Sequence, residues 1–92
     1  MAKLNASQIK SALAGVPDWR KQGSTISRVF ERKDFPAAVK FVSKAAALAE
    51  KAWHHPDIDI RWNKVTLTLT THDEGGLTEK DFKLAIKFDR LA

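Results

Sequence analysis

The spacing of apolar residues changes at Pro56, and that change constrains the fold more than any other feature. From Asp34 to His54, apolar residues recur at intervals of three or four, which places them on one face of a helix. Beyond the proline, apolar and polar residues alternate through 58–62 and 65–70, as in strands with one buried face. The sequence therefore predicts a long helix followed by an antiparallel hairpin.

Two local signals set the boundaries of these elements. Pro56 disfavours helical geometry at His55, so the helix is expected to end at the histidines. Asn63-Lys64 is the expected turn of the hairpin, which would bring both apolar sets to one face of the sheet. The facing pairs predicted by that turn are Trp62 with Val65, Ile60 with Leu67, and Ile58 with Leu69.

The remaining segments complete an alternating order of elements. A short helix is expected over 7–14 with Ser7 as its N-cap, strands over 18–21 and 25–32, and a last helix over 78–90. Asp34 is the expected N-cap of the long helix. Strands that arrive as tight pairs favour an antiparallel sheet, and three one-sided helices can cover one of its faces. We therefore predict an α+β two-layer sandwich in the order α-β-β-α-β-β-α, with residues 1–92 as a single domain.

Composition narrows the classes of function. The chain has no cysteine, which excludes disulfides and thiolate metal sites, and no apolar run of membrane-spanning length. Its start does not resemble a signal peptide, so a cytoplasmic protein without a membrane partner is expected. The net charge of +5 comes from basic residues interrupted by acidic ones, which argues against a nucleic-acid footprint. Because so small a domain has a small core, self-association as a homodimer or homotetramer is expected.

The histidines are the side chains best suited to chemistry. Adjacent residues of an extended chain point to opposite sides, so His54 and His55 are poor partners for one metal ion, and no metal site is expected. No serine stands in an elbow-like glycine context that would mark an activated nucleophile. Imidazole titrates near neutral pH, so a cluster of histidines can supply both a proton donor and an acceptor.

Three further residues have both a structural and a functional interpretation. Glu50 stands four residues before His54 and could orient its ring, or it could be a solvated helix residue. His72 ends the second hairpin strand, where it could reach the other histidines or lie on the surface. Asp81 follows Thr78 by three residues, and on spacing alone a capping box is favoured over catalysis.

Several motifs together resemble the pterin-4a-carbinolamine dehydratase family. They are E-x3-HHP (Glu50, His54, His55, Pro56), an aromatic residue at Trp62, NKV-x-L-x-L-TTH ending at His72, and GGLTEKD ending at Asp81. Upstream, Trp19, Arg28, Phe30, Phe35, Ala38 and Phe41 fit a looser pattern, so the similarity covers nearly all of the chain after Pro17. Two positions depart from the animal members: Ile58 stands where they have a pocket tryptophan, and Trp53 replaces a polar residue.

The resemblance implies a lyase that dehydrates 4a-hydroxytetrahydropterin to quinonoid dihydropterin in tetrahydrobiopterin recycling, without a metal or organic cofactor. It implies catalytic roles for His54, His55 and His72. From the chemistry of the reaction we hypothesise that His54 or His72 donates a proton to the leaving oxygen and that His55 binds or polarises the pterin. It also implies a substrate pocket that includes Glu50, Pro56, Trp62 and Asp81. An alternative is a non-enzymatic interaction module, since animal members also act as dimerisation partners of a homeodomain transcription factor.

Overall fold

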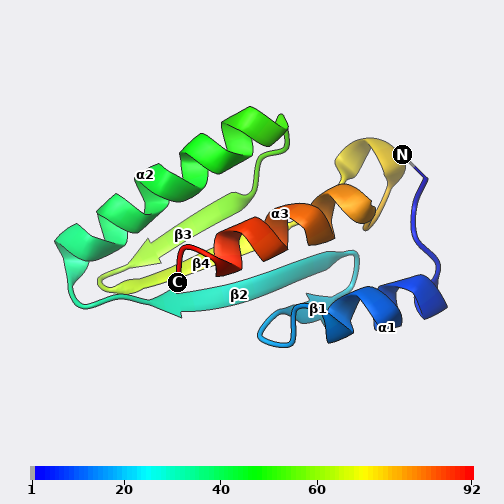
Figure 1. Ribbon diagram of the computed structural model, residues 1–92, viewed down its shortest axis with the longest axis horizontal. Coiled ribbons are helices and arrows are strands. Elements are labelled where there is room, and N and C mark those ends of the chain that lie inside the picture. The colour runs from blue at the N-terminus through cyan, green and yellow to red at the C-terminus, as the bar shows by residue number, and fades with distance from the viewer. Residues whose placement is uncertain (1) are drawn as a thin grey trace.

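The computed structural model describes residues 2–92, and its four strands form one antiparallel sheet in the order β1-β2-β4-β3 (Figure 1). The elements are α1 (Ala6–Ala14), β1 (Arg20–Gln22), β2 (Thr25–Glu31), α2 (Phe35–Ala52), β3 (Asp57–Arg61), β4 (Lys64–Leu69), the 3₁₀ turn η1 (His72–Glu74) and α3 (Glu79–Asp89). The predicted α+β sandwich and its order of elements are confirmed. No helix of the described residues is long and apolar enough to cross a bilayer.

The core lies between the sheet and the helices. In Figure 1, α2 and α3 run across one face of the sheet, and α1 lies beside the edge strand β1. Alternate residues of β2 and β4 are buried on the helical side, and α1 adds partly buried apolar residues to the same core. The buried strand residues are Ile26, Phe30, Val65, Leu67 and Leu69. The packing thus follows the period of two that the sequence shows in its strands.

The caps explain where the helices begin. Asp34 accepts a hydrogen bond from the Ala37 amide at the start of α2, as predicted. Thr78 caps α3 within a capping box, also as predicted. At α1, however, Asn5 rather than Ser7 is the N-cap, and its side chain accepts from the amide of Gln8.

The predicted register of the β3–β4 hairpin is wrong by two residues. The turn consists of Trp62 and Asn63, so Ile60 faces Val65 and Ile58 faces Leu67. A shift of two preserves the face on which each side chain emerges, and the apolar residues of both strands remain on the helical side.

A tertiary contact of Asn63 accounts for the shift. The side-chain amide of Asn63 donates to the backbone carbonyl of Arg32 at 2.9 Å, and the backbone carbonyl of Asn63 accepts from the Arg32 amide at 2.7 Å. Asn63 is therefore buried against the end of β2, whereas Trp62 is 70% exposed and has a left-handed backbone with φ 54°. A hairpin considered alone does not contain this contact.

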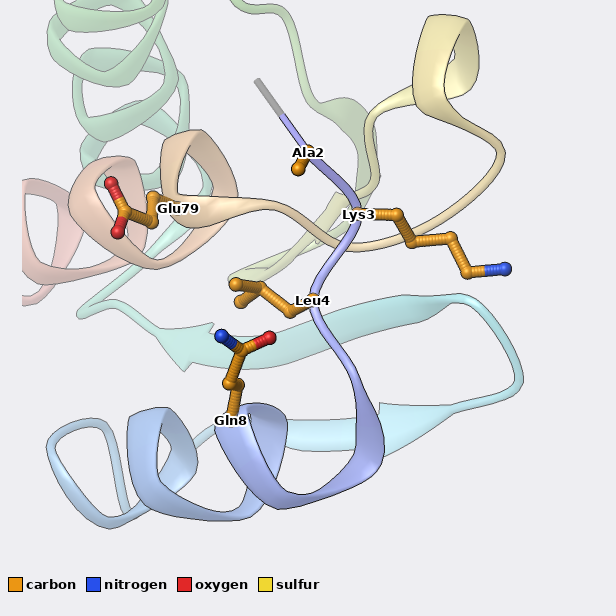
Figure 2. A pocket seen from close by; sticks show the side chains of 5 residues that line it. All are labelled: Ala2, Lys3, Leu4, Gln8 and Glu79. Carbon is orange, nitrogen blue, oxygen red and sulfur yellow. The ribbon is translucent and has the colours of Figure 1, made fainter.

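The N-terminal segment packs across the start of α3. The Leu4 amide donates to the Leu77 carbonyl at 2.8 Å, and a hollow of about 240 Å³ lies beside it. Figure 2 shows that Leu4 points into the space between α1 and Glu79, whereas Lys3 points away from that carboxylate. The hollow is lined by Ala2, Lys3, Leu4, Gln8 and Glu79. The Gln8 side chain is already engaged in the α1 cap, so this hollow reflects the docking of the segment on the domain.

Candidate active site

The C-terminal end of α2 places the histidine pair. Helix α2 ends at Ala52 because Trp53 adopts the left-handed conformation, with φ 54° and ψ 42°. Its amide donates to the Glu50 carbonyl, and the His54 amide donates to the Ala49 carbonyl. The chain then leaves the helix and enters β3 at Asp57. The predicted end of the helix at the histidines is confirmed.

All three histidines line one pocket of about 290 Å³. His54 and His55 follow α2, whereas His72 begins η1 directly after β4. The C-terminal end of α2 and the η1 turn lie at the same end of the sheet in Figure 1. The full lining is Trp53, His54, His55, Thr70, Thr71, His72, Asp73 and Lys80. The fold thus brings together imidazoles that the chain separates by seventeen residues or more.

His54 is bound to a buried carboxylate. Its Nε2 lies 2.5 Å from Oδ1 of Asp81, which is 0% exposed, and the His54 side chain is only 12% exposed. An ionised carboxylate can only accept, so this contact places a proton on Nε2 of the histidine. The two residues are 27 positions apart, since His54 follows the end of α2 and Asp81 lies in the first turn of α3.

Two donors hold the other oxygen of that carboxylate, and a further hydroxyl supports one of them. Oδ2 of Asp81 accepts from the Thr71 hydroxyl at 2.9 Å and from the Thr78 amide at 3.0 Å. The Thr78 hydroxyl lies 2.9 Å from that of Thr71, to which it can donate. The capping-box interpretation of Asp81 is therefore correct, and the same side chain also orients His54. Because a buried charge is tolerated only when it is paired, the network keeps Asp81 as an acceptor.

His55 has a different and more exposed partner. Its Nε2 lies 2.8 Å from Oε1 of Glu50, and the two side chains are 57% and 67% exposed. Of the two interpretations of Glu50, the one in which it orients His54 is wrong, because spacing by four assumes a helix that continues through residue 54. The left-handed turn at Trp53 instead directs His54 to α3 and leaves His55 beside Glu50.

None of the four residues predicted to bind the substrate, Glu50, Pro56, Trp62 and Asp81, is part of the pocket lining. Pro56 connects His55 to β3, and Trp62 occupies the hairpin turn at the far end of that strand. Conversely, the pocket includes Thr71 and Lys80, which sequence reasoning missed. Thr71 stands directly before His72 in the same motif, and that adjacency was the available signal.

The arrangement suits proton transfer. When neutral, His54 keeps its proton on Nε2 beside Asp81, which makes Nδ1 the acceptor. The carboxylate stabilises the imidazolium that forms when Nδ1 is protonated. His72 lines the same pocket and is exposed to solvent. Among residues 2–92, no group of three or more histidine, aspartate or glutamate side chains is arranged to hold a metal ion.

Comparisons with known proteins agree with this architecture. The family model described as pterin 4 alpha carbinolamine dehydratase matches residues 2–91. Relatives grouped under that enzyme name include proteins from Roseiflexus sp. (strain RS-1), 52% identical over 97% of this chain and 96% of the relative, and from Chloroflexus aurantiacus (strain J-10-fl), 54% identical over 99% and 98%.

Two solved structures share the fold. The transcriptional coactivator/pterin dehydratase from Brucella melitensis is 40% identical and superposes with a TM-score of 0.93, covering 98% of both chains. A pterin dehydratase-like protein identified as a RuBisCO assembly factor in the alpha-carboxysome is 28% identical, with a TM-score of 0.69 over 82% of this chain and 89% of that one.

Proposed function

This chain belongs to the pterin-4a-carbinolamine dehydratase family, and we propose from that premise that it dehydrates 4a-hydroxytetrahydropterin to quinonoid dihydropterin. The substrate is the by-product of aromatic amino acid hydroxylation, so the reaction would serve tetrahydrobiopterin recycling. One observation carries the proposal: three imidazoles line one pocket, and one of them is bound to a buried carboxylate.

The proposed reaction needs one acid and one base. The bond between C4a and its hydroxyl oxygen breaks, and the oxygen leaves as water after it receives a proton. The neighbouring ring nitrogen loses its proton, and its electron pair forms the new C4a–N double bond. Because one proton is supplied and one is removed, no oxidant or reductant takes part. Each positioned proton transfer contributes roughly 10²–10⁴-fold to the rate.

The surroundings of the imidazoles suggest their roles. We assign the base to His54, because Asp81 stabilises the positive charge that His54 gains. His72, open to solvent, would donate to the leaving oxygen and be reprotonated from water. His55, held by exposed Glu50, would bind or polarise the pterin.

Turnover of synthetic 4a-hydroxytetrahydropterin tests the proposal. The purified protein should remove the absorbance of the 4a-hydroxypterin faster than buffer alone does. The single variants His54→Ala, His55→Ala and His72→Ala should each be slower than wild type. Phe35→Ala, at the opposite end of α2, is a suitable control because that exposed ring lies outside the pocket. Unchanged rates in all three histidine variants would refute the catalytic assignment.

The relatives also raise the alternative of a non-enzymatic interaction module. One solved relative is described as a transcriptional coactivator as well as a pterin dehydratase, and another as a RuBisCO assembly factor. In this chain, the complete histidine pocket and its buried carboxylate favour the enzyme, because a scaffold needs neither. A folded wild-type protein without turnover would support the module instead.

Thr71 provides a conservative probe of the site. We expect Thr71→Val to lower kcat about 3–10-fold and the free energy of unfolding by about 1–2 kcal/mol, because buried Asp81 loses a donor. Activity assays and urea unfolding would measure these effects. Thr68→Val is the matched control, since Thr68 lies on the opposite face of the sheet. Equal behaviour of the two variants would show that the Thr71 hydroxyl does not support the site.

We also expect the protein to associate with further copies of itself. Strand β3 is an edge of the sheet, and its Ile58 and Ile60 are 40% and 38% exposed. Exposed apolar residues on an edge strand favour association with another chain. We expect light scattering to give the mass of a dimer or a tetramer at micromolar concentration. A monomer mass over that range would contradict the expectation.

A further inference from the structure

We infer that Trp53 is a substrate-recognition residue whose indole stacks on the flat C2–N3–C4 side of the pyrimidine ring of the bound pterin, away from the tetrahedral C4a. This role rests on the proposed function and adds a specificity-determining contact to it. Trp53 lines the same pocket as the three histidines, although no hydrogen bond or charge assigns it a part in the proton transfers. Three observations on its exposure, backbone and ring contact carry the inference.

The first observation is exposure. The Trp53 side chain is 73% exposed, the largest fraction among the large apolar residues that the structure leaves open. An exposed indole gains little from the core, and burial of its apolar surface would be favourable. At the rim of a pocket, a flat ligand is the partner that could cover it.

The second observation is the backbone of Trp53. The left-handed conformation at a helix C-terminus is normally taken by glycine, because a side chain with a Cβ atom is disfavoured there. A bulky aromatic residue at this position is therefore unfavourable both for its backbone and for its exposed side chain. Sparsely populated backbone conformations of this kind cluster at ligand sites, where the side chain has a use.

The third observation is the orientation of the ring. The centroids of Trp53 and His55 lie 5.6 Å apart with an interplanar angle of 70°, so one ring presents its edge to the other. His55 is itself held by Glu50. The ring contact places the indole beside the His55 imidazole. A pterin that reaches the histidines would thus lie against an aromatic side chain, and offset stacking of flat rings is a favourable arrangement.

Steady-state kinetics of Trp53→Gly and Trp53→Phe test the inference. Trp53→Gly should raise KM about 3–10-fold and leave kcat within about twofold, because stacking holds the substrate but moves no proton. Trp53→Phe should keep KM within about twofold of wild type. Phe35→Ala, which removes an exposed aromatic ring at the other end of α2, should change neither constant.

A stability measurement separates the weaker substrate binding of Trp53→Gly from unfolding of the protein. Glycine suits the left-handed backbone, so Trp53→Gly should raise the melting temperature by about 2–5 °C while it weakens substrate binding. A merely structural tryptophan would not give opposite changes in stability and KM.

The substrate side chain identifies the part of the ligand that Trp53 contacts. KM should rise by the same factor for a 6-methyl substrate and for one with a longer substituent at C6, because both share the pyrimidine ring. A rise confined to the longer substrate, or an unchanged KM in Trp53→Gly, would overturn the inference.

A direct binding measurement distinguishes failure of the Trp53 inference from failure of the proposed dehydratase function. In calorimetry with 7,8-dihydropterin as the probe, Trp53→Gly should show a Kd about 3–10-fold higher than wild type. Wild-type protein without turnover refutes the dehydratase proposal, whereas an unchanged Kd refutes the role of Trp53 even in an active enzyme.

Discussion

Replacing His54 with alanine should lower kcat for 4a-hydroxytetrahydropterin by about 10²–10⁴-fold, the range of one positioned proton transfer. His54 is the imidazole bound to a buried carboxylate, so its loss removes the group best able to stabilise the proton that leaves the substrate. KM should change less than kcat, because binding also uses the rest of the pocket. Initial rates at saturating substrate, followed by absorbance, would measure both constants.

His55→Ala is the matched comparison for this prediction. The two histidines are neighbours, but His55 pairs with an exposed carboxylate, and such pairs contribute little stability. We expect His55→Ala to act mainly through KM, in keeping with a role in binding the pterin. A kcat of His54→Ala within about twofold of wild type, in a folded protein, would contradict the role of His54 as base.

Replacing Asp81 should have the largest effect on stability. Its carboxylate is fully buried, caps α3 through the Thr78 amide, and contacts both Thr71 and His54. Asp81→Ala leaves these buried donors without an acceptor, and we expect the free energy of unfolding to fall by about 3–5 kcal/mol. Urea unfolding would measure the loss.

Two other variants separate the roles of Asp81. Asp81→Asn preserves the size of the side chain but removes its charge, so we expect kcat to fall about 10–100-fold with a smaller loss of stability. Glu79→Gln controls for a charge in the first turn of α3, since that carboxylate is exposed and should change stability by less than about 0.5 kcal/mol. Equal stability of Asp81→Ala and Glu79→Gln would contradict the buried network.

The architecture could be predicted because each element has its own spacing of apolar residues and its own boundary residues. The change of spacing at Pro56 located the end of α2 and the start of the hairpin, and Asp34 and Thr78 marked the two longer helices. These signals are local, so they do not depend on the rest of the fold. Because the strands come in pairs joined by short turns, an antiparallel sheet was the expected arrangement.

The finer pairing could not be predicted because distant residues determine it. The hairpin register depends on the contact between Asn63 and Arg32, which are 31 residues apart. The partner of His54 depends on the left-handed turn at Trp53 and on helix α3. Helical spacing therefore suggested His54 as the partner of Glu50, whereas the structure pairs Glu50 with His55. The histidines were the natural candidates because few other residues of this chain can transfer protons near neutral pH, and the fold places all three at one pocket.

The most direct test of the account is the rate of 4a-hydroxytetrahydropterin dehydration by wild type and by the triple variant His54→Ala/His55→Ala/His72→Ala, each measured against buffer. We predict that wild type accelerates the loss of 4a-hydroxypterin absorbance and that the folded triple variant gives no more than the rate in buffer. Equal acceleration by both proteins would contradict catalysis by the three imidazoles of this pocket.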